Sequence, residues 1–253
     1  MLKEAPPLVY VVGDVHGCFS LYSKLEALIL RDSAHCLPGA RALIVLLGDL
    51  VDRGPKSAQM LDLVLGPAPE GAQRLALAGN HEEMFQKFLV APRPDAPWLE
   101  YGGRETLNSY GIYPPNGQNF SELSARRLGR MVATSVPQDH MDGLARLPVS
   151  LRLPRYLISH AGIDVHKPLN EQSEWDLMWS DPAELDQEPT AGQGPVGLLD
   201  LAAEGMQVVH GHVPAADPFE HSRRLSIDTG AYATGTLCAV RLTPRGAPLF
   251  LRV

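Results

Sequence analysis

The sequence predicts an α/β fold in which short buried strands alternate with helices. Three short aliphatic runs each end in glycine followed by a side chain with an oxygen donor. They are residues 8–12 before Gly13-Asp14, 42–47 before Gly48-Asp49, and 74–78 before Gly79-Asn80. The three glycines are 35 and 31 residues apart, about the length of a strand–helix–strand unit. Continuous apolar runs are typical of strands covered on both faces, so we expect a largely parallel sheet between helices.

The segments between these runs have the apolar spacing of amphipathic helices. An apolar stripe through residues 21–29 follows Ser20, a residue type that favours the helix N-cap. Pro55 suits the first turn of a second helix, which Gly66-Pro67 would end. A third helix is expected to begin near His81. The polar residues after each strand would then meet at the carboxyl edge of the sheet, where open α/β sheets bind ligands.

Residues 91–150 depart from this alternating pattern. A proline-rich loop at 91–97 precedes stretches with helical spacing near 121–134 and 138–146, which indicates a helical cap insertion. From Pro148 onward the sequence again has the pattern of strands. The expected strands are 149–153, 155–160, 206–211, 223–228, 236–242 and 248–252.

Composition limits the classes of function. The 253 residues carry a net charge of −7, and such a surface repels polyanions, so no nucleic-acid partner is expected. The longest fully apolar run, Ala42–Leu47, is far shorter than the ~20 residues of a transmembrane helix, so no membrane partner is expected. Three scattered cysteines lack metal-type spacing, and the N-terminus lacks a signal-peptide pattern. We therefore expect a reduced, cytoplasmic setting.

Side chains that bind metals gather at the ends of the predicted strands. The donors are Asp14 and His16 in Gly13–Gly17, Asp49 and Asp52 in Gly48–Gly54, Asn80 and His81 in Gly79–Glu82, His160, and His210 and His212. Carboxylate, imidazole and amide ligands together suit borderline divalent ions such as manganese, iron or zinc. The set is too rich for one ion, so it predicts two metal ions about 3.5–4 Å apart that share a carboxylate.

The order and spacing of these motifs resemble the PPP-type metallophosphoesterases of the calcineurin-like superfamily. The nearest branch is that of bacterial serine/threonine phosphatases and symmetrical diadenosine tetraphosphatases. The matching motifs are Gly13–Gly17, Gly48–Gly54, Gly79–Glu82, His160–Gly162 and Gly211–His212, with weaker likenesses at Gly102–Gly111, Leu177–Ser180 and Ile227–Tyr232. The resemblance implies two mixed β-sheets packed as a central sandwich flanked by helices. It also implies one domain over residues 1–253, with the helical cap inserted at about 91–150.

The resemblance also implies a role for each site residue. Asp14, His16 and His212 would hold the first metal, Asn80 and His160 the second, and Asp49 would bridge the two. His81, oriented by Asp52, would protonate the departing oxygen, and Arg53 would hold phosphate oxygens. These roles agree with the chemistry, because two dications offset phosphate charge and a guanidinium can bind two oxygens at once. Manganese is the expected metal, with iron or zinc as the alternatives.

The implied activity is phosphoester hydrolysis, in which a metal-bridging hydroxide attacks phosphorus in line. The main expectation is a serine/threonine phosphatase that acts on a phosphoprotein or a small phosphoester. The alternative is symmetrical hydrolysis of a dinucleoside polyphosphate such as diadenosine tetraphosphate, for which Arg126, Arg127 and Arg130 offer cationic contacts. A catalytically inactive module that binds phosphorylated partners is less favoured, because every ligand position and His81 are present.

Other residues near the motifs have simpler interpretations. Glu82 and Glu83 would favour a helix N-terminus through the helix dipole. Asp228 is expected at a strand end, His140 on the surface, and Trp98 in the core of the cap.

One position departs from the family pattern. The bacterial proteins that the sequence resembles place a phosphate-clamping arginine two residues after the tryptophan that matches Trp179, whereas this chain has Asp181. Residues 168–222 contain no Lys or Arg and 11 Asp or Glu. Either Arg104 or a cap residue, Arg126 or Arg127, replaces the clamp, or the site works with one clamp and prefers substrates with positive charge beside the phosphate. The second option is the favoured expectation.

Overall fold

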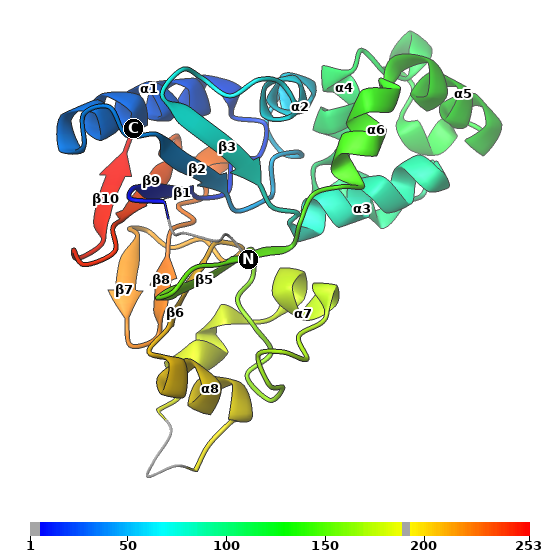
Figure 1. Cartoon of the computed structure of the whole chain (residues 1–253). Coiled ribbons are helices and arrows are strands. Elements are labelled where there is room, and N and C mark those ends of the chain that lie inside the picture. The colour runs from blue at the N-terminus through cyan, green and yellow to red at the C-terminus, as the bar shows by residue number, and fades with distance from the viewer. Residues whose placement is uncertain (1–5, 189–192) are drawn as a thin grey trace.

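Two five-stranded sheets form the centre of the structure (Figure 1). The computed structural model describes residues 6–188 and 193–253, and no helix in these ranges is long and apolar enough to span a membrane. The first sheet contains β1 (Val9–Val12), β2 (Ala42–Leu46), β3 (Ala72–Ala76), β9 (Cys238–Leu242) and β10 (Leu249–Arg252), in the order β10-β9-β1-β2-β3. The second contains β4 (Ser150–Arg152), β5 (Tyr156–Ser159), β6 (Gln207–His210), β7 (Phe219–His221) and β8 (Arg224–Ser226), in the order β4-β5-β6-β8-β7.

Both sheets are mixed, which confirms the predicted fold class. In the first sheet β1, β2 and β3 are parallel, and β9 is antiparallel to both β1 and β10. In the second sheet β5, β6 and β8 are parallel, with β4 and β7 antiparallel at the edges. The strands expected after residue 148 are present, whereas the short edge strand β7 was not predicted. The third strand begins at Ala72 rather than near residue 74.

The alternation of side chains along each strand separates the layers. Val9 and Val11 of β1 pack in the core between the two sheets, whereas Tyr10 and Val12 pack against helices. Those helices are α1 (Phe19–Cys36), α2 (Ser57–Leu65) and α3 (Asn80–Val90). On the outer face of the second sheet, α7 (Glu174–Trp179), η4 (Pro182–Asp186) and α8 (Val196–Glu204) share a third core with Leu157 and Val208 (Figure 1). Burial on both faces explains why the strands are continuous apolar runs.

The start of α1 differs from the prediction. The helix begins at Phe19 with Cys18 as its N-cap, so Ser20 lies inside the first turn and does not cap it. The preceding loop closes on itself through a hydrogen bond from the Cys18 N–H to the Val15 carbonyl, and Gly17 has φ +62°. Because of this turn, the helix begins two residues before the position that an N-cap at Ser20 would give.

The segment 91–150 forms a group of short helices beside α2 and α3 (Figure 1). Its elements are η1 (Pro97–Tyr101), α4 (Gly103–Ser109), η2 (Pro115–Gly117), η3 (Phe120–Glu122), α5 (Ala125–Ser135) and α6 (Gln138–Leu144). Their apolar side chains belong to the same core as β1 to β3. We therefore propose that this segment is an insertion within one domain of residues 1–253.

His140 is buried rather than exposed as the sequence predicted. Its ring nitrogens lie 2.8 Å from the Tyr110 hydroxyl and 3.0 Å from the Asp62 carboxylate. These contacts join α6 to α2, so the side chain serves to attach the inserted helices to the body of the fold.

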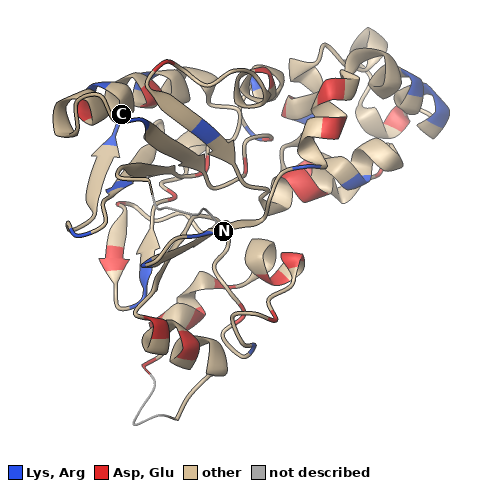
Figure 2. Cartoon of the chain, viewed as in Figure 1, with Lys and Arg blue, Asp and Glu red and all other residues tan. Residues whose placement is uncertain are grey.

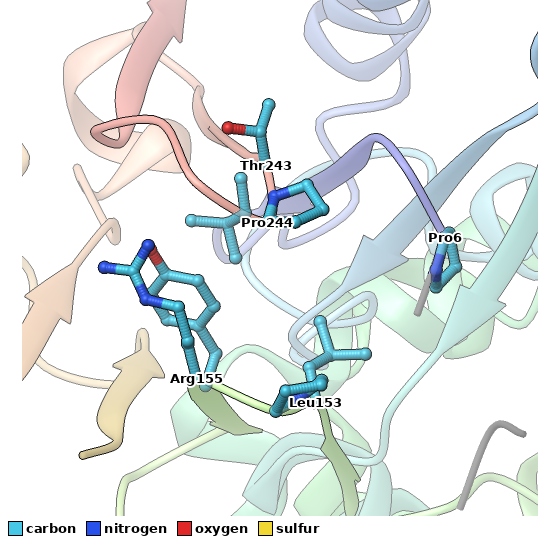
Figure 3. A pocket seen from close by; sticks show the side chains of 8 residues that line it. Pro6, Leu153, Arg155, Thr243 and Pro244 are labelled. Atoms are coloured by element: carbon cyan, nitrogen blue, oxygen red, sulfur yellow. The ribbon is translucent and has the colours of Figure 1, made fainter. Parts of the chain in front are cut away.

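A small pocket of about 80 Å³ lies where β1 and β5 begin (Figure 3). Pro6, Leu153, Arg155 and Pro244 are among the side chains that surround it. The polar residues predicted for the functional site follow the opposite, carboxyl ends of these strands, so this pocket is separate from them.

Candidate active site

The predicted site residues converge where parallel strands of both sheets end. Asp14 follows β1, Asp49 follows β2, and Asn80 begins α3 after β3, while His160 and His212 follow β5 and β6. Apart from Arg53 and His212, each predicted site residue is at most 5% exposed. The structure therefore brings together donors that are up to 198 positions apart, since the His212 N–H donates to Asp14 Oδ2 at 2.9 Å.

Asp49 lies at the centre of this cluster. Its Oδ2 is 3.4 Å from His16 Nε2 and 3.8 Å from His81 Nε2. Its Oδ1 is 3.4 Å from His160 Nε2. Burial raises the pKa of the Asp49 carboxyl, but the nearby His160, His81 and His16 outweigh it and lower that pKa. Two groups of side chains could therefore each hold a cation, and both include the Asp49 carboxylate. One group also contains His16 and His81, and the other contains Asp14 and His160.

The side chain of His212 lies beside Asn80 and His160. Its Nδ1 lies 3.1 Å from Asn80 Oδ1 and 3.2 Å from His160 Nε2, whereas only its backbone N–H reaches Asp14. Two metal ions about 3.5–4 Å apart would have neighbouring ligands, so the assignment of His212 to the first metal with Asp14 and His16 stays a prediction.

The donor set fits two divalent cations. Asp14 Oδ1 is buried, and no hydrogen-bond partner reaches it among residues 6–188 and 193–253. A side chain at Gly211 would place Cβ 2.0 Å from that oxygen, and one at Gly79 would place Cβ 2.3 Å from Asp49 Oδ1. Glycine at both positions keeps the space around the carboxylates open, and an unpaired buried carboxylate oxygen is costly without a cation.

Backbone strain is concentrated at this site. Within the described ranges, seven non-glycine residues have positive φ, and five of them are predicted site residues. They are His16, Asp49, Asp52, Arg53 and His212. Such conformations cost on the order of 1–3 kcal/mol each and persist where the surrounding structure imposes them. The strain therefore marks the cluster as a functional centre.

His81 is oriented by a buried network. Its Nδ1 lies 2.6 Å from Asp52 Oδ2, which also accepts the Trp98 indole N–H at 2.6 Å. The Thr106 hydroxyl donates to the other oxygen of Asp52 at 2.6 Å. Burial lowers the pKa of His81, but the Asp49 charge and the hydrogen bond with Asp52 outweigh it and raise that pKa. The sequence predicted the His81–Asp52 pair. It did not predict that Trp98 and Thr106 donate hydrogen bonds to the Asp52 carboxylate.

Arg53 spans the two histidines. Its Nη1 and Nη2 lie 2.9 Å from His16 Nε2 and 3.1 Å from His81 Nε2. Its guanidinium carbon is 4.6 Å from the centre of the Tyr232 ring. The backbone N–H of Arg53 donates to the Gly102 carbonyl at 3.2 Å, and only glycine fits there because a Cβ would lie 2.4 Å from that nitrogen. The guanidinium fork is therefore held over the donor cluster, in a position suited to phosphate oxygens.

A family model described as calcineurin-like phosphoesterase matches residues 7–240. The chain belongs to this family. It is 26% identical over 238 residues to the asymmetrical bis(5'-nucleosyl)-tetraphosphatase PrpE of Geobacillus sp. (strain WCH70), covering 91% of this chain and 89% of that protein.

Two solved structures share the calcineurin-like fold with this chain. One is described as that of "a putative diadenosine tetraphosphatase", with a TM-score of 0.62, 22% identity, and coverage of 99% of this chain and 96% of the other. The other is the cold-active protein-tyrosine phosphatase of a psychrophilic Shewanella species, with a TM-score of 0.53, 16% identity, and coverage of 98% and 81%. At these identities the two matches support the fold alone.

Glu82 holds together the loops of this calcineurin-like site. Its fully buried carboxylate accepts four backbone N–H groups, those of Asp49 (2.7 Å), Leu50 (2.8 Å), Val51 (3.2 Å) and Gly79 (2.9 Å). The interpretation of Glu82 through the helix dipole did not predict this role. The capping-box spacing could have indicated that Glu82 binds backbone N–H groups, because Glu82 is the third residue after Gly79.

Glu82→Gln is expected to destabilise the protein by about 2–3 kcal/mol, because an amide nitrogen then faces buried N–H donors and leaves them unpaired. Urea denaturation followed by circular dichroism measures the change. Glu70→Gln, at an exposed residue, is the matched control and is expected to stay within about 0.5 kcal/mol of wild type. An equally small change in Glu82→Gln would show that the four N–H groups do not depend on the carboxylate.

The folded structure neutralises part of the negative charge of the acidic segment 168–222. Asp176 pairs with Lys167 at 2.7 Å, and Asp186 pairs with Arg224 at 2.5 Å, so cations from just outside the segment neutralise part of its charge. Asp181 accepts the Ala183 N–H at 2.9 Å and caps η4. These contacts weaken the expectation of a preference for positively charged substrates.

Among the candidate replacement clamps, Arg104 lies in α4, two residues after the Gly102 carbonyl that accepts the Arg53 N–H, and its side chain pairs with Glu100. Arg126 and Arg127 belong to α5, at the outer end of the inserted helices (Figure 2).

Proposed function

We propose that this calcineurin-like phosphoesterase is a two-metal hydrolase of dinucleoside polyphosphates. The observation that carries the chemistry is the position of Asp49 in both donor groups. The substrate class is supported by the relatives, since the protein at 26% identity over 91% of this chain is named a bis(5'-nucleosyl)-tetraphosphatase. The motifs that led to the expectation of a serine/threonine phosphatase serve chemistry common to both substrates, so they favour neither.

We propose the ligands that the family pattern implies. Asp14, His16 and His212 would hold one cation, and Asn80 and His160 the other, with Asp49 between them. Two bound dications, for which manganese is our first choice, would supply an activated water and offset the charge of the phosphate. The unpartnered oxygen of Asp14 supports its assignment as a ligand.

The remaining residues would handle the phosphate and the proton. The Arg53 fork would bind two oxygens of the phosphoryl group that is attacked. His81 would donate a proton from Nε2 to the departing oxygen, because Asp52 fixes the opposite nitrogen, Nδ1. Trp98 and Thr106 hold the Asp52 carboxylate, so they would act by positioning His81 through it.

The names of the relatives also bear on which bond of the polyphosphate substrate is cleaved. PrpE is named the asymmetrical enzyme, whereas the sequence motifs led us to expect symmetrical cleavage. Asymmetrical attack on diadenosine tetraphosphate yields ATP and AMP, whereas symmetrical attack yields two ADP. We propose the asymmetrical cut.

Turnover of diadenosine tetraphosphate and of phosphoserine peptides, compared with manganese held constant, tests the function. We expect higher kcat/KM for diadenosine tetraphosphate, ATP and AMP as products on ion-exchange chromatography, and loss of turnover after EDTA treatment. Higher kcat/KM for the peptides would support the phosphatase instead. No turnover of either substrate by metal-loaded protein would support the inactive binding module.

Arg53→Ala is expected to lower kcat/KM about 10²–10³-fold, because a bidentate contact to the reacting phosphate is lost. Arg53→Lys should recover only part of this loss, since an ammonium cannot fork onto two oxygens. Steady-state kinetics on the same substrate measure both variants. A lysine variant equal to wild type would contradict the bidentate assignment.

A further inference from the structure

Two stacked tryptophans extend outward from the candidate metal centre. Trp175 and Trp179 lie four residues apart in α7, and their ring centroids are 4.9 Å apart with an interplanar angle of 17°. The Trp179 ring is 6.4 Å from the ring of His212. Trp175 is 56% exposed, so the stack begins beside a site histidine and ends in solvent.

The stack is held rigidly although its outer ring is exposed. Ser173 and Asp176 form a capping box at the start of α7, and Lys167 binds the Asp176 carboxylate at 2.7 Å. The Trp179 indole N–H donates to Glu83 of α3 at 3.0 Å, on the helix that begins with Asn80. A fixed aromatic surface loses little conformational entropy when a second ring stacks on it.

A cavity of about 260 Å³ lies beside Trp175, between α3, the end of α6 and α7. Its apolar lining includes Leu144, Leu147 and Met178. Its size is below the roughly 300–1,000 Å³ of pockets for drug-sized ligands, and it therefore suits a smaller group such as a single heterocyclic base.

The cavity also has hydrogen-bond acceptors. Gln86 and Glu174 line it, and so does Glu83, whose two oxygens already contact the Lys87 ammonium and the Trp179 N–H. The side-chain nitrogen of Gln86 donates to the Leu144 carbonyl at 3.0 Å, which leaves its oxygen free to accept. Acceptors around a stacking surface match an exocyclic amino group on the edge of a purine such as adenine.

We infer that the Trp175–Trp179 stack and this cavity form the purine-nucleoside subsite of the enzyme. The inference rests on the proposed function and deepens it, because it assigns the residues that bind one end of a dinucleoside polyphosphate. The base stacks on Trp175, its amino group points to the acceptors in the cavity, and the phosphate chain runs past Trp179 toward His212. The Lys87 ammonium lies 5.8 Å from the centre of the Trp175 ring and pairs with the Glu83 carboxylate at 2.9 Å.

Competitive inhibition of nitrophenyl phosphate hydrolysis tests this subsite without relying on dinucleotide turnover. We compare AMP with ribose 5-phosphate, which carries the same phosphate and sugar but no base. Base–aromatic stacking is worth about 1–3 kcal/mol, so AMP is expected to bind wild type about tenfold more tightly or better. In Trp175→Ala the two inhibitors should bind within about twofold of each other, and Trp175→Phe should restore most of the difference.

Two further variants guard against effects of folding. Ala145 lines the cavity and is exposed, so Ala145→Phe fills the space without disturbing a core, and it should also reduce the AMP preference. Tyr113→Ala removes an aromatic side chain of similar exposure (59%) outside the cavity lining and should keep the preference.

The outcomes separate this inference from the proposed function. Equal binding of AMP and ribose 5-phosphate by wild type would overturn the subsite even if diadenosine tetraphosphate is hydrolysed. A preference for AMP that survives in both Trp175→Ala and Ala145→Phe would place the base elsewhere and also overturn it. A Trp175-dependent preference in an enzyme that cleaves only phosphopeptides would retain the subsite and reject the proposed substrate.

Discussion

Asp49→Asn is expected to lose at least one of its two metal ions and nearly all hydrolytic activity. The substitution removes the negative charge shared by the two donor groups, while the amide has almost the same size. Removing an outer partner of a metal ligand already costs about 10–100-fold in metal affinity, and removing a shared ligand should cost more. Elemental analysis after gel filtration in manganese measures the metal content, and steady-state kinetics measure the activity.

Asp139→Asn is the matched control, because it makes the same chemical change at an exposed residue of α6. It should bind two equivalents and hydrolyse substrate like wild type. Circular dichroism of both variants checks that the fold is retained. Two bound equivalents in Asp49→Asn, together with turnover like that of wild type, would reject the shared-ligand role.

His81→Asn is expected to slow the hydrolysis of phosphoserine peptides or other alkyl phosphates about 10²–10⁴-fold, because the departing alkoxide then lacks a proton donor. The loss should be much smaller with nitrophenyl phosphate, whose leaving group needs little protonation. It should also be smaller with diadenosine tetraphosphate, because phosphate oxygens have pKa values near 6 and leave readily as anions.

The same variant also tests whether His81 is a ligand instead. His81 lies within reach of a cation held by His16 and Asp49, so its loss could act through the metal. Metal content close to that of wild type is expected if His81 is a proton donor. Reduced metal content would identify His81 as a ligand, and an equal loss of rate across all leaving groups would contradict its role as proton donor. Asp52→Asn should reproduce the dependence on the leaving group in weaker form, since it disturbs the orientation of His81 without removing it.

The sequence by itself determined the elements and the type of chemistry. Buried strands must be apolar on both faces, and the glycine after each strand allows a tight turn, so short runs ending in Gly-Asp or Gly-Asn are visible without any tertiary information. Asp14, Asp49 and Asn80 were found in this way. The order of the motifs along the chain then led to the correct family.

Only the tertiary structure decided how distant side chains group. The His212 ring lies beside Asn80 and His160 because the two sheets pack face to face and strands of both end at the same site. Neither the packing of one sheet on the other nor the positive φ of His212 leaves a periodic signal in the sequence. The same holds for Asp52, whose partners Trp98 and Thr106 come from the inserted helices 46 and 54 positions away.

Glu82 and the Trp175–Trp179 stack illustrate the same limit. A glutamate at the start of a helix has a sufficient local explanation in the helix dipole, and no sequence pattern had singled out Trp175. Their partners, the loop of Asp49 for Glu82 and the surroundings of His212 for Trp179, follow from how the helices dock against the sheets. Such long-range contacts depend on three-dimensional packing, which local residue preferences do not encode.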